Sequence, residues 1–145
     1  MPTVEKSVLV EYPAAAMFAL IDGIERYPEF LPWCGGAEVT LREGETVRAT
    51  LHIDYHGIKQ AFTTENRASG GKTIDMVLVN GPFRHLNGAW RFTPLGDTAC
   101  KVELRLSYEF SSRVLEKLVG PVFHRIANSF VEAFVKRARQ LNGDR

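Results

Sequence analysis

Two periodicities meet in the stretch of residues 99–141, ACKVELRLSYEFSSRVLEKLVGPVFHRIANSFVEAFVKRARQL, and together they predict the main elements of the fold. In its first part apolar and polar residues alternate, which predicts a β-strand with one covered face and one wet face. Beyond Ser111 and Ser112, either of which can cap a helix, apolar residues recur at helical spacing and predict a long amphipathic helix. Because a proline inside a helix removes a hydrogen bond, we expect a kink or a restart at Gly120-Pro121.

The two-residue period extends back along the chain to Gly35, which predicts several more strands upstream. Thr46 to Tyr55 is the clearest of them, because its odd-numbered positions are apolar and its even-numbered positions are polar. Turn signals separate the strands by about a dozen residues, which is typical of consecutive antiparallel hairpins. These signals are Glu43-Gly44, His56-Gly57, Ser69-Gly70-Gly71, Asn80-Gly81-Pro82 and Gly96-Asp97.

The residues before these strands predict one further strand and two short helices. Val4 to Glu11 is rich in β-branched residues, Pro13 suits the start of a helix, and Arg26 to Pro32 suits a second helical turn. The expected order is strand, two helices, six strands and a long helix, which is an α+β architecture. One helix can cover the apolar face of a sheet of about seven strands only if the sheet curves around it. We therefore expect a cavity between the curved sheet and the helix.

Composition limits the classes of protein to which the chain can belong. Its 145 residues suit one domain over 1–145, and its 45% hydrophobic and 24% charged residues are typical of a globular protein. A net charge of +1 gives no overall attraction to nucleic acid, and the two cysteines, Cys34 and Cys100, cannot form the disulfide framework of a small secreted protein. With neither a signal peptide nor an apolar run of ~18 residues, a cytoplasmic location is expected.

Two segments resemble a known family. Residues 27–34, YPEFLPWC, resemble the YP-x-FLPWC signature of the coenzyme Q-binding family and its bacterial relatives, the ribosome association toxin RatA family. Residues 130–138, FVEAFVKRA, resemble the F-x-x-AF-x-x-RA ending of that family. The element order is similar to the helix-grip fold of the START-like (SRPBCC) superfamily, which includes lipid-transfer domains and polyketide cyclases. The resemblance implies a START-like domain whose curved antiparallel sheet wraps around a long C-terminal helix.

The resemblance implies two functions, and the sequence leaves both open. Mitochondrial members bind ubiquinone and support cellular respiration, so the first function is a carrier or chaperone for ubiquinone or a similar isoprenoid lipid. Some bacterial members are toxins of toxin–antitoxin systems that bind the large ribosomal subunit and block subunit association, which is the second function. The chain has no N-terminal transit extension and therefore resembles a bacterial member. Peripheral contact with the inner membrane is compatible with the first function.

No group of residues in the sequence suggests catalysis or a metal site. Cys34 has no histidine near it in sequence, so we interpret it as a small, soft residue beside Trp33 rather than as a nucleophile. The residues thus predict a binding protein that is not an enzyme, with a cyclase-like enzyme as the third alternative, because superfamily cyclases use scattered cavity residues. No metal-ligand spacing joins the four histidines, which are His52, His56, His85 and His124.

An apolar ligand in the expected cavity would contact inward-facing residues of the sheet, the helix and the segment before the second strand. Tyr55, Tyr108 and Trp90 carry hydrogen-bond donors that suit the two carbonyl groups of a quinone. Trp33 suits a buried plug or, at the cavity rim, a gate or a contact with a membrane surface, and the roles of plug and gate are compatible. The predicted lining consists of Leu31, Trp33, Ile53, Tyr55, Phe62, Met76, Trp90, Tyr108, Val119, Val122, Phe123, Ile126 and Phe130.

The polar face of the C-terminal helix is locally basic. Its cations suit the phosphates of ribosomal RNA or anionic lipid headgroups, and they equally suit a solvated surface near a helix C-terminus. The residues that we expect to make a surface contact are Lys117, Arg125, Lys136 and Arg137.

Overall fold

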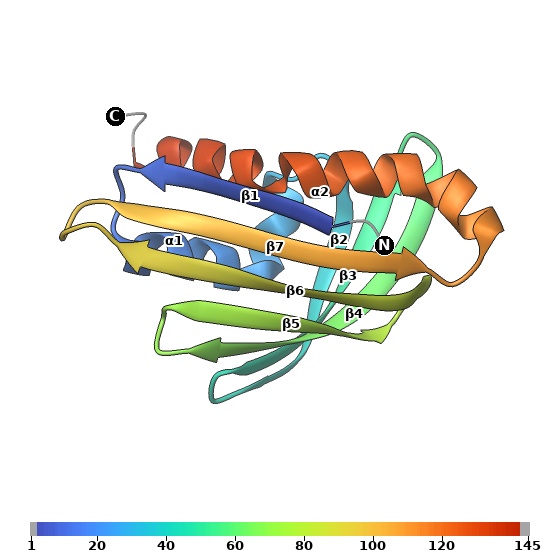
Figure 1. Cartoon of the computed structure of the whole chain (residues 1–145), viewed down its shortest axis with the longest axis horizontal. Helices are drawn as coiled ribbons and strands as arrows, with labels where there is room; N and C mark the ends of the chain where they lie inside the picture. The colour runs from blue at the N-terminus through green and yellow to red at the C-terminus, as the bar shows by residue number, and fades with distance from the viewer. Residues whose placement is uncertain (1–2, 143–145) are drawn as a thin grey trace.

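The computed structural model describes residues 3–142, and in this range seven strands and two α-helices follow the order expected from the sequence (Figure 1). The α+β class, with a curved antiparallel sheet and a long C-terminal helix, is confirmed. In chain order the elements are β1 (Thr3–Val10), α1 (Ala14–Asp22), the 3₁₀ helix η1 (Ile24–Glu29), β2 (Cys34–Glu43), β3 (Thr46–Tyr55), β4 (Ile58–Ser69), β5 (Thr73–Asn80), β6 (Phe83–Pro94), β7 (Cys100–Phe110) and α2 (Arg113–Leu141).

The strands form one sheet in the order β1-β7-β6-β5-β4-β3-β2, and all neighbouring strands are antiparallel. Strands β2 to β7 are successive hairpin neighbours, whereas β1 pairs with β7, with Val4 opposite Leu106 and Val10 opposite Cys100. The segment between β1 and β2 therefore starts at one edge of the sheet and ends at the other, and α1 and η1 make that crossing. Figure 1 shows β1, β6 and β7 running along α2 while β3 and β4 cross it steeply, as expected of a curved sheet.

The second short helix differs from its predicted position. We expected a helical turn over Arg26 to Pro32, but η1 begins at Ile24 and ends at Glu29. Phe30, with a φ of −140°, has already left the helical region. The turn ends early because Leu31 precedes a proline and is therefore disfavoured in the helical conformation.

Helix α2 is continuous over 29 residues, so the restart considered at Gly120-Pro121 does not occur. Figure 1 shows its first turns inclined to the rest, which fits the kink that a proline causes by removing one backbone hydrogen bond. Of the two candidate serines, Ser112 is the cap: its hydroxyl oxygen accepts a hydrogen bond from the backbone N–H of Leu115 at 3.2 Å. Ser111 instead donates to the carbonyl of Pro82 at 3.2 Å.

Substitution of the capping serine should weaken the helix end. Ser112→Ala is expected to lower the free energy of unfolding by about 1 kcal/mol, because the first turn of α2 loses its side-chain acceptor. Urea denaturation followed by circular dichroism measures this change. Ser129→Ala is the matched control, because it lies in the middle of α2, where alanine is the better helix former. A loss of equal size in both variants would contradict the capping role.

The buried face of α2 packs on the concave face of the sheet. Strands β6 and β7 supply to this concave face four side chains that are each 2% exposed or less, namely Trp90, Phe92, Leu104 and Tyr108. Burial of each large apolar side chain stabilises the fold by roughly 1.5–3 kcal/mol. The buried residues of α2 recur at helical spacing, and they are Val119, Phe123, Ile126, Ala127, Val131, Phe134 and Ala138.

Candidate functional site

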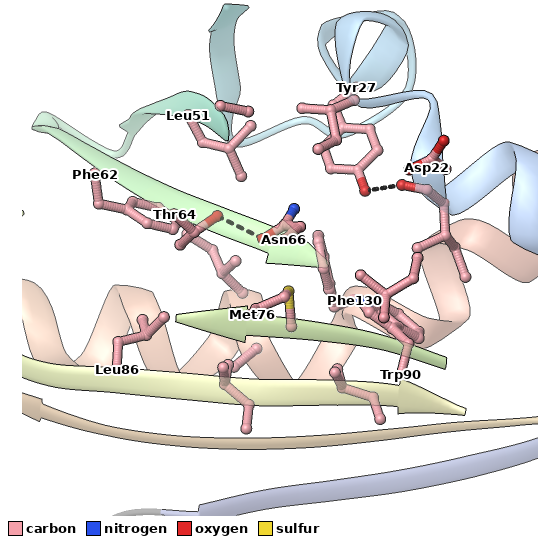
Figure 2. A pocket seen from close by; sticks show the side chains of 18 of the residues that line it. Asp22, Tyr27, Leu51, Phe62, Thr64, Asn66, Met76, Leu86, Trp90 and Phe130 are labelled. Atoms are coloured by element: carbon pink, nitrogen blue, oxygen red, sulfur yellow. Dashed lines mark hydrogen bonds between the residues drawn. The ribbon is translucent and has the colours of Figure 1, made fainter. Parts of the chain in front are cut away.

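A cavity of about 70 Å³ lies between the concave face of the sheet, the crossing segment and α2 (Figure 2). Its walls are mostly apolar. The volume is about half of the ~150 Å³ of an apolar cavity that admits benzene, so a ring-sized ligand enters only if side chains move. The lining residues are Ile21, Asp22, Ile24, Tyr27, Trp33, Ala49, Leu51, Phe62, Thr64, Asn66, Ile74, Met76, Leu86, Trp90, Leu104, Leu106, Phe123, Ile126, Ala127 and Phe130.

The cavity brings together some of the residues predicted to contact a ligand and leaves the others elsewhere. Those that line it are Trp33, Phe62, Met76, Trp90, Phe123, Ile126 and Phe130. Four others are buried in the core outside the lining, and these are Leu31, Ile53, Tyr108 and Val119. Tyr55 and Val122 are partly exposed and also lie outside it. Alternation and helical spacing select the inward face of an element, but the cavity occupies only part of that face.

Of the three predicted hydrogen-bond donors, Trp90 lines the cavity and the two tyrosines do not. The hydroxyl of Tyr108 lies 3.3 Å from Nδ1 of His124, on the outer side of α2. Burial raises the pKa of Tyr108, so its hydroxyl stays protonated at neutral pH. Tyr55, at the end of β3, instead contacts the ring of His56 edge-on, with 4.1 Å between the ring centroids.

Two polar side chains from β4 line the cavity, and sequence reasoning missed both. Thr64 is 8% exposed and Asn66 is 9% exposed, and the Thr64 hydroxyl donates to Oδ1 of Asn66 at 2.9 Å. The signal for them was present, because the alternation that turns Phe62 inward also turns positions 64 and 66 inward.

Tyr27 closes the cavity on the side of the crossing segment. It belongs to the segment that resembles the family signature, yet it was not among the predicted ligand contacts. Its hydroxyl donates to the backbone carbonyl of Ile21. Burial, and after it the negative charge of Asp22, raises the pKa of Tyr27 well above its usual value. The phenol is therefore neutral, and its hydrogen is already used within the protein.

Trp33 lies between the cavity and a groove of about 480 Å³ on the outside of the molecule, because it lines both. The groove runs between the segment that follows η1 and the last turns of α2, and Pro32, Ser129 and Lys136 are among its walls. Trp33 is 5% exposed and contacts the ring of Phe130, with 5.9 Å between the ring centroids. In this position it closes the cavity toward the groove.

Arg137 holds the segment before Trp33 against α2. Its Nη2 forms an ion pair with Oε1 of Glu29 at 2.7 Å, and its guanidinium lies over the ring of Phe30, 5.1 Å from the centroid. Only 18% of its side chain is exposed. Arg137 therefore belongs to this internal contact rather than to the open basic face on which it was expected.

The open basic face consists of cations on the side of α2 turned away from the sheet. Lys117, Arg125 and Lys136 are exposed there, as predicted for a surface contact. Glu132 is exposed between the last two and reduces the positive charge locally. The cations extend along the helix for roughly 28 Å, at 1.5 Å per residue.

The environment of Cys34, the grouping of candidate metal ligands and the character of the helices bear on three further kinds of function. Cys34 is buried and donates to the carbonyl of Gly36 at 3.3 Å, and burial raises the pKa of its thiol, so the nucleophilic thiolate is disfavoured. Within residues 3–142 no three side chains of the His, Cys, Asp and Glu types lie together as a metal site would need. In the same range no helix combines the length and the apolar character needed to cross a membrane.

Comparison with known proteins decides the family. Residues 10–135 match the family model described as polyketide cyclase / dehydrase and lipid transport. The chain belongs to this family. The match extends from the last residue of β1 into the final turns of α2, so it includes every element that lines the cavity.

Members of this family with similar sequences are named as a toxin and as a binding protein. The chain is 44% identical over 144 residues to ribosome association toxin RatA of Vibrio cholerae, which covers 99% of this chain and 100% of that protein. It is 25% identical over 143 residues to coenzyme Q-binding protein COQ10 homolog B, mitochondrial, of Xenopus laevis, which covers 95% of this chain and 58% of that protein. The predicted resemblance to the coenzyme Q-binding and RatA family is thereby confirmed.

Solved structures confirm the START-like helix-grip fold. The aromatase/cyclase Zhui from Streptomyces sp. R1128 superimposes with a TM-score of 0.84 at 17% identity, covering 97% of this chain and 95% of that chain. A START superfamily protein from Mycobacterium smegmatis superimposes with a TM-score of 0.76 at 22% identity, covering 96% and 98%. At these identities the likeness establishes the fold and carries no activity over.

Proposed function

We propose that this protein associates with the ribosome, as the name of its RatA relatives implies, and thereby inhibits growth. The observation that carries the proposal is the 44% identity with the Vibrio cholerae protein, because the alignment covers 99% of this chain and 100% of that protein. By the same resemblance the contact is with the large subunit, and the consequence is that the two subunits fail to join.

The exposed basic face of α2 is the surface that suits ribosomal RNA. Lys117, Arg125 and Lys136 project from one rigid helix, so their spacing is fixed before binding. Cations held in this way bind phosphates and release the counterions that surround RNA, which makes the affinity depend on salt. The Glu29–Arg137 ion pair contributes to the shape of this surface rather than to its free charge, because the cation is already paired.

Reversal of two of these charges tests the surface. Arg125→Glu combined with Lys136→Glu is expected to lower co-sedimentation with the large subunit at least about tenfold and to relieve growth inhibition on overexpression. Sucrose-gradient sedimentation of cell extracts measures both the protein and the fraction of joined subunits.

The matched control carries the same change of charge on the opposite side of the molecule. Lys72→Glu combined with Arg91→Glu alters exposed residues on the hairpin and outer face of the sheet, and it should leave sedimentation unchanged. Loss of association in both double variants would mean that the net charge of the protein, rather than the position of the cations on α2, controls binding. Unchanged association of the α2 variant would remove this face from the proposal.

A second function is favoured by the cavity, namely binding of an apolar ligand such as a quinone or another isoprenoid lipid. Its support is the apolar lining, the family description that includes lipid transport, and the coenzyme Q-binding relative. Burial of each CH₂ group contributes about 0.8 kcal/mol, so a ligand with an apolar tail needs few polar contacts. Organic extraction of the purified protein and titration with a short-tailed ubiquinone test it. An empty extract together with no binding in the titration would exclude it.

A further inference from the structure

Thr64 and Asn66 form a polar pair in an apolar wall. Both side chains come from β4 and are more than nine-tenths buried, and around them the cavity is lined by Phe62, Ile74 and Met76. Buried polar groups in proteins are normally matched by hydrogen-bond partners. A polar atom that faces a cavity without such a partner therefore indicates what the cavity is built to receive.

One hydrogen bond orients the Asn66 amide. The Thr64 hydroxyl donates to Oδ1 of Asn66 at 2.9 Å, so the oxygen side of the amide points at Thr64. Figure 2 shows the amide nitrogen turned away from Thr64 into the space among the lining side chains. Within residues 3–142 no acceptor takes a hydrogen bond from this nitrogen, so its two hydrogens are available in the cavity.

We infer that Asn66 binds a carbonyl oxygen of the ligand, so that the cavity selects an apolar molecule carrying a ketone, quinone or ester group. This inference rests on the second function proposed above, ligand binding in the cavity. An amide nitrogen is a donor only, and a carbonyl oxygen is an acceptor that brings no hydrogen of its own to be satisfied. A hydrocarbon of the same shape would cover this nitrogen without accepting a hydrogen bond from it, which lowers the affinity of the hydrocarbon.

Thr64 is a positioning residue in this arrangement. Its hydroxyl fixes the amide in the orientation that presents nitrogen rather than oxygen to the cavity. Without that bond the amide can rotate and present either atom, so the preference for an acceptor weakens without a change in cavity shape.

Met76 is the lining residue best able to make room for a ring. Its side chain is only partly buried, and its three rotatable bonds let it change conformation at little cost. The same residue lies close to Asn66 along the hairpin, because the two are paired between β4 and β5. Widening at Met76 therefore opens the cavity next to the free amide nitrogen.

Two ligands of equal shape test the inference. Acetophenone and α-methylstyrene differ only in a carbonyl oxygen against a methylene group, and isothermal titration calorimetry gives the affinity of each. The measured quantity is the ratio of the two affinities, because the cost of desolvating each ligand then cancels between variants. Asn66→Leu is expected to shift the ratio about tenfold toward α-methylstyrene, and Thr64→Val is expected to shift it by less.

The outcomes separate this inference from the function on which it rests. Asn80→Leu, on an exposed asparagine at the end of β5, is the control and should leave the ratio unchanged. If both ligands bind and Asn66→Leu leaves the ratio unchanged, the role of Asn66 is wrong while ligand binding stands. If neither ligand binds the wild-type protein, ligand binding and this inference fail together.

Discussion

Phe134→Ala is expected to lower the free energy of unfolding by about 3–5 kcal/mol, a large part of the stability of a domain of this size. Phe134 is 1% exposed and lies at the centre of an aromatic cluster between α2, the crossing segment and β6. Its ring centroid is 5.0 Å from that of Phe130, 5.2 Å from Tyr27, 5.4 Å from Phe30 and 5.6 Å from Trp90. Removal of this ring leaves a void that four fixed neighbours cannot fill.

Urea denaturation followed by circular dichroism gives the change in the free energy of unfolding. Leu118→Ala is the control on the same helix, because Leu118 is 61% exposed and its loss should change stability by less than about 0.5 kcal/mol. A loss below about 1 kcal/mol for Phe134→Ala would mean that the cluster does not hold the crossing segment on α2. In that case Tyr27 and Trp33 would not be held in place as walls of the cavity either.

The sheet and the long helix were predictable because each has one period over many residues. Thr46 to Tyr55 coincides with β3, and the alternation in the last strand ends at Phe110, where β7 ends. The crossing segment has no such period. Prolines and short-range sterics decide where η1 ends, so its predicted position was several residues too late.

The cavity was predictable as an architectural consequence, and its lining was predictable only in part. Inward faces follow from local periodicity, whereas the position of a void along those faces depends on how far the sheet curves from the helix. Tyr108 shows the difference, because it faces inward on β7 yet its hydroxyl pairs with His124. Thr64 and Asn66 show the converse, because their register places them inside although their chemistry suggests the outside.

The basic face of α2 was predictable as a charge pattern but not residue by residue. Lys117, Arg125 and Lys136 are exposed because α2 turns their positions away from the sheet. Arg137 is one position beyond Lys136, which on a helix is enough to point it at Glu29 and Phe30 of the crossing segment. Contacts of this kind join segments that are far apart in the chain, so they cannot be predicted from the local sequence.

Ala127→Leu is expected to separate the two proposed functions. Ala127 is 2% exposed and lines the cavity from α2, so a longer side chain at this position extends into the cavity. Exclusion of a quinone ring removes the ~3 kcal/mol that its burial contributes, which lowers affinity at least about a hundredfold. Co-sedimentation with the large subunit should stay unchanged, because Arg125 and Lys136 lie on the opposite, exposed side of the helix.

Titration with a short-tailed ubiquinone and sucrose-gradient sedimentation measure the two functions on the same preparations. Ala16→Leu, on the exposed side of α1, adds the same side chain outside the cavity and should affect neither measurement. Ala49→Val fills the cavity from β3 and replaces Ala127→Leu if overpacking unfolds the latter. If the filled variants stay folded and bind ubiquinone as tightly as the wild type, the ligand does not occupy the cavity. If the filled variants instead no longer co-sediment with the large subunit, a change inside the cavity affects binding at the basic face. The two functions are then coupled.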